Sequence, residues 1–184
     1  MSKNGRGLGD GHVWAGSEVS PDGRSGPALF VSYRSVNWPS AALLKQALIH
    51  RFGTRAVFFD VDTLNGGDLV QDGIMKALES ATVMLVVIDK DWSMTIEGRD
   101  GHRRPDNPRD WVRVEIRYAL GHGLTIIPVQ VDETPLPGVG NLPADLAGLA
   151  DRMARPLRHS STRDDLARLI DDVEYALQHG NRAN

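Results

Sequence analysis

Glu115 is the side chain of this sequence whose surroundings stand out chemically. It lies in the stretch 110–120 (DWVRVEIRYAL), and its helical neighbours three and four positions away include no cation, so no local ion pair explains it. Trp111 and Tyr118 share its helical face and would set the carboxylate between two aromatic rings. An apolar surround lowers the effective dielectric and strengthens the help that a carboxylate gives to a developing positive charge. The simpler interpretation is a solvated glutamate on the shoulder of an amphipathic helix.

The helix that would carry Glu115 is well marked. Asp110 precedes it and can cap it, because a carboxylate accepts hydrogen bonds from the free backbone N–H groups of the first turn. Apolar residues then recur at helical spacing, as a core-facing stripe requires. They are Val112, Ile116, Ala119 and Leu120.

Short apolar runs alternate with amphipathic stretches along the rest of the chain. The runs predict strands buried on both faces of a parallel sheet, at 28–33, 55–59, 82–88 and 125–131, with a weaker fifth at 153–157. Pro128 inside the fourth run predicts a bulge or an edge position. The stretches between the runs predict helices near 39–52, 69–78 and 142–149, and a last one capped by Ser161 or Thr162. The expected inner faces of the first two helices include Leu43, Leu44, Ala47, Leu48 and Phe52, and Leu69, Val70, Ile74, Ala77 and Leu78.

This alternation predicts an α/β fold with a flavodoxin-like, five-stranded parallel sheet, the first strand central and helices on both faces. Ligands of such sheets bind at the carboxyl ends of the strands, where the winding reverses. Here that edge includes the loop 32–38, and the helix of Glu115 can lean over it. The domain is expected to span 28–178, after a flexible leader at 1–27 and before a tail at 179–184. The long polar loop 89–108 is either a lid or interaction loop, or a solvated insertion.

Composition limits the classes of function. The 184 residues suit one domain, 41% hydrophobic content supports a core, and a net charge of −3 argues against direct nucleic-acid binding. The absence of cysteine rules out a thiolate nucleophile or ligand. The sequence shows no membrane span and no signal peptide, so we expect a cytoplasmic protein without a membrane partner. We expect no metal site, because Asp100, His102 and Asp106 are irregularly spaced, and no phosphate-binding glycine motif is present.

Several ordered motifs together resemble the TIR (Toll/interleukin-1 receptor-like) domain of the bacterial kind. They are 29–34 (LFVSYR), 58–60 (FFD) running into 64–68 (LNGGD), 110–115 (DWVRVE) and 126–129 (IIPV). Their order and spacing match from about residue 28 to residue 178. The resemblance implies the same sheet and often a self-associating module. In many bacterial members it also implies cleavage of NAD⁺ at the nicotinamide–ribose bond, for NAD depletion or a cyclic ADP-ribose-type signal in antiviral defence.

Residue by residue, the resemblance places Glu115 at the catalytic glutamate and Trp111 at an aromatic that lines its pocket. Phe30, Ser32 and Arg34 match the strand-end positions beside the nucleotide. Ser35 is a departure, since many members have a second basic residue there. The BB loop falls at 60–67, where Asp60 and Leu64 are expected to contact substrate and Asp62, Asn65, Gly66 and Gly67 to serve the loop and assembly.

The chemistry suits one carboxylate. Nicotinamide leaves NAD⁺ as a neutral molecule, so it needs no general acid, unlike the leaving group of an ordinary glycoside. NAD⁺ is then the substrate, and no further cofactor is implied. Whether water or an adenine nitrogen captures the ribosyl cation, giving hydrolysis or cyclisation, stays open.

The expected partners are other TIR protomers in a head-to-tail assembly, and a sensor or effector protein, because the sequence contains no recognisable sensor domain. A non-catalytic TIR–TIR scaffold is the main alternative, since the fold alone does not separate the two. A phospho-acceptor receiver domain would need acidic residues after the first strand, where this chain has Ser32, Tyr33 and Arg34.

Overall fold

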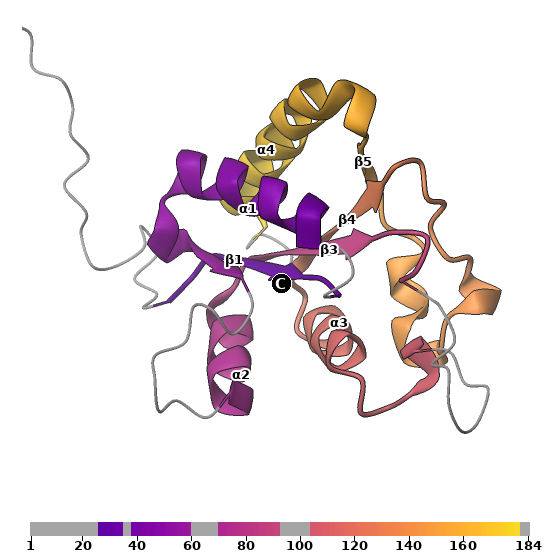
Figure 1. The fold of residues 1–184 in the computed structure, drawn as a ribbon. Coiled ribbons are helices and arrows are strands. Elements are labelled where there is room, and N and C mark those ends of the chain that lie inside the picture. Colours follow the sequence, from indigo (N-terminus) through magenta and orange to yellow (C-terminus); the bar gives the residue numbers. More distant parts are fainter. Residues whose placement is uncertain (1–25, 35–37, 60–69, 93–103, 181–184) are drawn as a thin grey trace, which may run out of the picture.

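A five-stranded parallel sheet forms the centre of the computed structural model, which describes residues 26–34, 38–59, 70–92 and 104–180 (Figure 1). The strands pair in the order β2-β1-β3-β4-β5, so the first strand is internal and the winding reverses between β1 and β3. This order confirms the predicted flavodoxin-like sheet. The strands are β1 (Leu29–Ser32), β2 (Val57–Phe59), β3 (Val83–Ile88), β4 (Thr125–Val131) and β5 (Arg155–Leu157).

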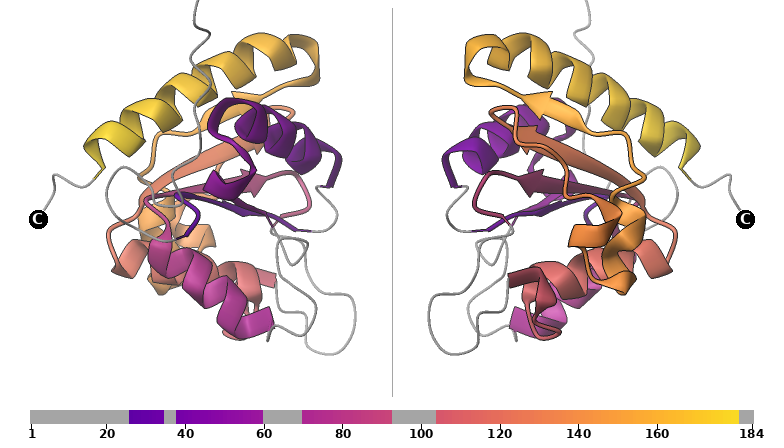
Figure 2. Two further views of the ribbon diagram at one scale, coloured as in Figure 1. Left: turned by 90° about the vertical axis from the view of Figure 1, so that its left-hand side faces the viewer. Right: turned by 90° about the vertical axis from the view of Figure 1, so that its right-hand side faces the viewer.

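Four α-helices of the described chain cover the two faces of the sheet (Figures 1 and 2). They are α1 (Trp38–Phe52), α2 (Val70–Ser80), α3 (Trp111–Gly121) and α4 (Thr162–His179). Helices α1 and α4 pack on one face, and α2 and α3 pack on the other together with the 3₁₀ helix η6 (Ala144–Leu149). Alternate residues of each strand enter opposite layers, so nearly every strand position is buried, as both-faced burial requires. Shorter 3₁₀ turns are η2 (Thr54–Ala56), η4 (Arg104–Asp106), η5 (Val139–Asn141) and η7 (His159–Ser161).

Three local predictions are wrong. Pro128 lies in a regular internal strand, in register with Val86, and not in a bulge or an edge strand. The described pairing of β4 with β5 begins only at Val129, so proline sits where that side of β4 is still unpaired. Leu43 and Val70 are 46% and 48% exposed and do not belong to the inner faces of their helices.

The start of α4 is held by a buried carboxylate rather than by a serine cap. Asp165 is 2% exposed and accepts hydrogen bonds from the backbone N–H and the guanidinium of Arg158, at 3.0, 3.0 and 2.7 Å. The Ser161 hydroxyl donates to the same carboxylate at 3.0 Å, instead of capping the helix. The hydrogen bonds from Arg158 hold the pKa of Asp165 well below its usual range.

The described chain contains no helix with the length and apolar character needed to cross a membrane. Of the long loop predicted at 89–108, the structure describes the residues that follow β3 up to Trp92 and the part from residue 104 onward. The predicted leader and tail, apart from residues 26–27 and 179–180, lie outside the described residues.

Candidate active site

The carboxyl end of β1 aims a serine at helix α3. Phe30 belongs to the layer that α2 and α3 cover, and side chains two apart on a strand share a face, so Ser32 points into the same layer. On α3, the inner face consists of Val112, Glu115, Ile116 and Ala119, all of them buried. A polar residue at the end of an apolar strand thus meets the one acidic residue of this helical face.

Glu115 is buried and hydrogen-bonded, so the interpretation as a solvated surface glutamate is wrong. It is 8% exposed, and Ser32, which is 1% exposed, donates from Oγ to Glu115 Oε2 at 2.6 Å. That separation is typical of a hydroxyl bound to a carboxylate, and such charge-assisted bonds are among the stronger ones. The contact fixes the orientation of the Glu115 carboxylate at the reversal point of the sheet, where β1 and β3 pair side by side.

The capping prediction for α3 is confirmed. Asp110 is the N-cap residue, and its Oδ1 accepts from the backbone N–H of Arg113 at 3.1 Å. The same carboxylate binds Arg34, whose two terminal nitrogens donate to Asp110 Oδ2 and Oδ1 at 2.8 and 3.1 Å. Arg34 is 6% exposed, and its Nε also donates to the Trp92 carbonyl oxygen at 2.9 Å. The guanidinium expected to meet a substrate phosphate therefore faces the partly buried carboxylate of Asp110 in this structure.

The predicted aromatic residues take different places around Glu115. Phe30 stacks on Phe58 with 5.0 Å between ring centroids and forms part of the floor under α2 and α3. Trp111 is 40% exposed, so its ring is available to a ligand or a partner. Tyr118 stacks on His122 at 3.8 Å, one turn farther along the helix.

The predicted BB-loop residues lie outside the described residues. These are the expected substrate contacts Asp60 and Leu64, and the expected loop and assembly residues Asp62, Asn65, Gly66 and Gly67. Asp100 and His102 also lie outside the described residues. Within the described part of the chain, no group of His, Asp and Glu side chains could hold a metal ion.

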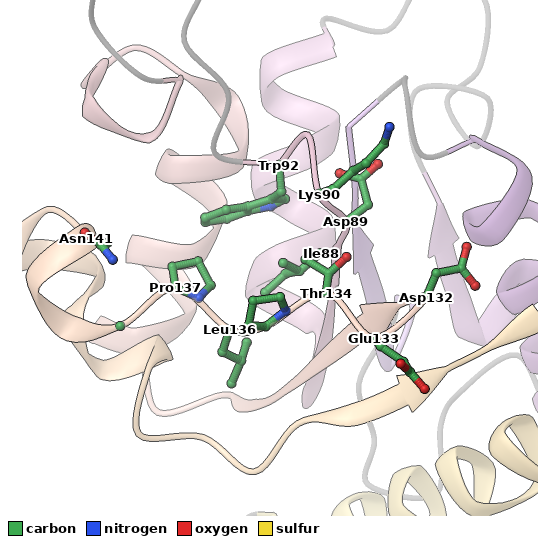
Figure 3. Close-up of a pocket in the computed structure, with 12 residues that line it drawn as sticks. Ile88, Asp89, Lys90, Trp92, Asp132, Glu133, Thr134, Leu136, Pro137 and Asn141 are labelled. Atoms are coloured by element: carbon green, nitrogen blue, oxygen red, sulfur yellow. The ribbon is translucent and has the colours of Figure 1, made fainter.

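A cavity of about 650 Å³ opens beside Trp92, the residue that Arg34 contacts, at the carboxyl ends of β3 and β4 (Figure 3). Trp92, Leu136 and Pro137 form an apolar wall, and charged side chains lie toward its other side, with Asp89 and Lys90 close together. Burial raises the pKa of Asp89, partly offset by a hydrogen bond from the Asp91 backbone. Trp92 is shared: its ring lines the cavity, and the guanidinium carbon of Arg34 lies 5.5 Å from the ring centroid.

The turn that closes this cavity is conformationally unusual. Asp132 and Glu133 follow β4 with φ of 47° and 62°, in the left-handed region that non-glycine residues rarely adopt. Thr134 pins the turn, since its backbone N–H and its Oγ1 both donate to the Val131 carbonyl oxygen, at 3.0 and 2.7 Å. Strained backbone of this kind costs about 1–3 kcal/mol per residue and clusters at functional sites.

Sequence reasoning did not identify several of these groups. Asp110 was expected only to cap a helix, and its ion pair with Arg34 spans 76 positions of sequence. Trp92 lies in a stretch whose composition predicts a polar loop, although a tryptophan there is a signal that this segment docks on the core. Nothing in the local sequence marked the turn at Asp132 and Glu133, because its left-handed backbone does not use glycine.

Two curated relatives match much of this chain. The NAD(+) hydrolase sarm1 of Drosophila melanogaster is 27% identical over 175 residues, which cover 83% of this chain and 12% of the relative. The NAD(+) hydrolase tir-1 of Caenorhabditis elegans is 32% identical over 101 residues, which cover 55% of this chain and 10% of the relative. The chain therefore matches only about a tenth of the length of either relative.

Solved structures share the fold at low sequence identity. The TIR domains of the activated Roq1 resistosome superpose with a TM-score of 0.57 at 17% identity, covering 79% of this chain and 98% of that one. A metazoan TIR-STING receptor from C. gigas gives 0.53 at 16% identity, covering 82% of this chain and 39% of the receptor. These likenesses support the architecture and carry no information on activity.

The family is decided by a model of the TIR domain, which matches residues 29–170. The match includes all five strands and the residues Ser32, Arg34, Asp110 and Glu115. The bacterial kind suggested by the motifs stays a prediction. Because the matched region covers most of its residues, this chain belongs to the TIR-domain family.

Proposed function

We propose that this chain cleaves NAD⁺ at the nicotinamide–ribose bond, with Glu115 as the catalytic carboxylate. The observation that carries the proposal is the buried Glu115 carboxylate, oriented by Ser32 at 2.6 Å beside the reversal point of the sheet. A buried carboxylate is costly unless something compensates for its lost hydration, so its presence at a ligand-binding edge favours a functional role. Two relatives named as NAD(+) hydrolases support the same reaction.

The main contribution that NAD⁺ cleavage needs from the protein is electrostatic stabilisation of the transition state. The glycosidic C–N bond breaks with its electron pair going to the pyridinium nitrogen, which becomes the neutral ring nitrogen of nicotinamide. Positive charge then develops on the ribose as an oxocarbenium ion, and the Glu115 carboxylate stabilises it from a fixed position in a low-dielectric site. Water adds to the ribosyl carbon and loses a proton to give ADP-ribose, or an adenine nitrogen adds to it to give a cyclic isomer.

Aromatic side chains around Glu115 would shape the proposed binding site for NAD⁺. Trp111, half-exposed one turn before Glu115, offers an aromatic face against which a flat ring can stack. Phe30 and Phe58 form a rigid floor next to Ser32. The TIR resemblance is the ground for including the BB loop, residues 60–67, in the proposed site.

Self-association and biological role belong to the same proposal. If the loop of one protomer completes the site of the next, assembly switches the enzyme on, and the contact is head-to-tail. Depletion of NAD⁺ or release of a cyclic product would then act in antiviral defence, in response to a partner that senses the trigger.

The test is incubation of concentrated protein with NAD⁺, with products separated by chromatography. We expect nicotinamide release, and loss of at least ~10²-fold in Glu115→Gln, the scale typical for removing one electrostatic group from an active site. Glutamine keeps an acceptor for Ser32, so the fold should survive, which circular dichroism would check. Glu79→Gln is the matched control, because Glu79 is an exposed helical glutamate on α2.

The outcomes separate the competing functions. Turnover of Glu115→Gln at the wild-type rate would remove Glu115 from the mechanism. Absence of nicotinamide release at every protein concentration, with or without a crowding agent, would favour the non-catalytic TIR scaffold. The co-product distinguishes hydrolysis from cyclisation.

A further inference from the structure

Arg34 ties together three segments at the carboxyl edge of the sheet. It follows β1 by two residues, donates from Nε to the carbonyl oxygen of Trp92 after β3, and pairs with Asp110 before α3. Its side chain is 5% exposed and that of Asp110 is 14% exposed. All three donor nitrogens of the guanidinium are engaged, at 2.9, 2.8 and 3.1 Å. This is the geometry of a buried structural clamp.

The clamp joins the two segments whose side chains meet at the candidate site. Ser32 lies two residues before Arg34 on the β1 side, and Glu115 lies five residues after Asp110 on α3. Asp110 makes both contacts, because its carboxylate binds Arg34 and its Oδ1 also accepts from the Arg113 backbone N–H, which caps the start of α3. A shift of Asp110 therefore moves the first turn of α3, and with it the residue that Ser32 contacts.

We infer that Arg34 is a positioning residue, which acts through Asp110 to hold α3 against β1 so that Glu115 accepts the hydrogen bond from Ser32. The inference rests on the proposed function for its catalytic consequence. It differs from the phosphate contact that the TIR resemblance implies for Arg34. A phosphate taking the same two-pronged contact would have to displace the partly buried Asp110 carboxylate, leaving that carboxylate without its cation.

The chain contains a matched pair for comparison. Arg113 donates from Nε and a terminal nitrogen to Asp145, at 3.1 and 2.9 Å, and its side chain is 14% exposed. It lies on the same helix α3, but it fastens the helix to η6 and, through its other terminal nitrogen, to the carbonyl oxygens of Pro105 and Asp106 in η4, rather than to β1. Loss of the Arg113 pair should therefore affect stability without moving Glu115 away from Ser32.

The test compares Arg34→Lys with Arg113→Lys in steady-state NAD⁺ cleavage. Lysine keeps the charge and loses the two-pronged geometry. We expect Arg34→Lys to lower kcat by roughly 10- to 100-fold with KM within about twofold, because a misplacement near 1 Å is enough to cost ~10²-fold. Arg113→Lys should stay within about threefold of wild type in kcat. A raised KM with unchanged kcat in Arg34→Lys would show a substrate contact instead and would overturn the inference.

A second variant and a structural readout make the test independent of activity and of one substitution. Asp110→Ser retains a capping oxygen and removes the partner of Arg34, so it should reproduce the kcat loss of Arg34→Lys. In crystal structures of both variants, we expect the Ser32 Oγ to Glu115 Oε2 separation to exceed hydrogen-bond distance, whereas Arg113→Lys keeps it near 2.6 Å.

The two failures are distinguishable. If the wild-type protein releases no nicotinamide, the proposed function fails, and the crystallographic separation alone decides whether the clamp positions Glu115. If either clamp variant retains the Ser32–Glu115 hydrogen bond, Arg34 does not act by positioning, whatever its activity. Thermal unfolding of each variant confirms that the measurements refer to folded protein.

Discussion

Replacement of Ser32 by alanine removes a buried hydrogen bond to the proposed catalytic carboxylate and little else. Ser32 is 1% exposed, and its Oγ lies 2.6 Å from Glu115 Oε2. Alanine differs only by the hydroxyl oxygen, so β1 and its pairing with β2 and β3 should persist. The variant therefore isolates the contribution of the orienting contact.

The expected magnitude follows from the character of the bond. A hydrogen bond to a charged group contributes about 1.5–3 kcal/mol, and each ~1.4 kcal/mol of transition-state stabilisation corresponds to tenfold in rate. If the contact acts fully in the transition state, Ser32→Ala should lower kcat by about 10- to 150-fold. The protein should also lose about 1–3 kcal/mol of unfolding free energy, since the buried carboxylate keeps one partner fewer.

The assay is steady-state nicotinamide release, with Ser80→Ala as the matched control. The Ser80 hydroxyl donates to the carbonyl oxygens of Ala77 and Pro27, at 3.0 and 3.2 Å, at the amino end of the sheet. Its loss should affect stability alone. A Ser32→Ala enzyme with kcat within about twofold of wild type would refute the view that Ser32 orients Glu115 for catalysis.

Two further predictions concern acid stability and assembly. The pKa of Asp165 is lowered in the folded protein by Arg158, so its stabilising contribution is complete above about pH 4–5 and is lost as the pH falls through the depressed folded value. Asp165→Asn should therefore be less stable at neutral pH and should flatten the acid limb of stability measured by denaturant unfolding, and an unchanged acid limb would contradict this. Specific activity should rise steeply with protein concentration if protomers complete one another's sites, and a constant specific activity across the concentration range would argue against assembly-driven activation.

Much of the fold could be predicted because its signals are local. The buried runs at 82–88 and 125–131 are nearly identical to β3 and β4, since a strand covered on both faces has to be continuously apolar. Asp110 marks the start of α3, because it caps the helix by accepting from the backbone N–H of Arg113, three residues away. Local pattern fails where the tertiary environment overrides it, as at Leu43, which fits an apolar stripe and yet is 46% exposed.

The candidate site also has some features that the local sequence predicts and others that only the tertiary structure determines. The sequence by itself singled out Glu115, as an acidic residue without a helical cation, and the family motifs around it. The tertiary structure alone decided that this carboxylate is buried and accepts from a serine 83 positions away. It also decided that the Arg34 guanidinium donates its hydrogen bonds to Asp110 and to the Trp92 carbonyl oxygen.

The physical reason is that periodicity reports which face of an element is apolar, but not which polar groups meet when two faces pack. A buried charge needs a hydrogen-bonding partner. Which residue becomes that partner depends on how α3 packs against β1, and this packing depends on the whole sheet. The same holds for the cavity between Trp92 and the turn at Asp132, which exists only because β3 and β4 end side by side. The sequence thus determined the sheet, its helices and the acidic residue, and the packing of α3 on β1 determined what holds that residue in place.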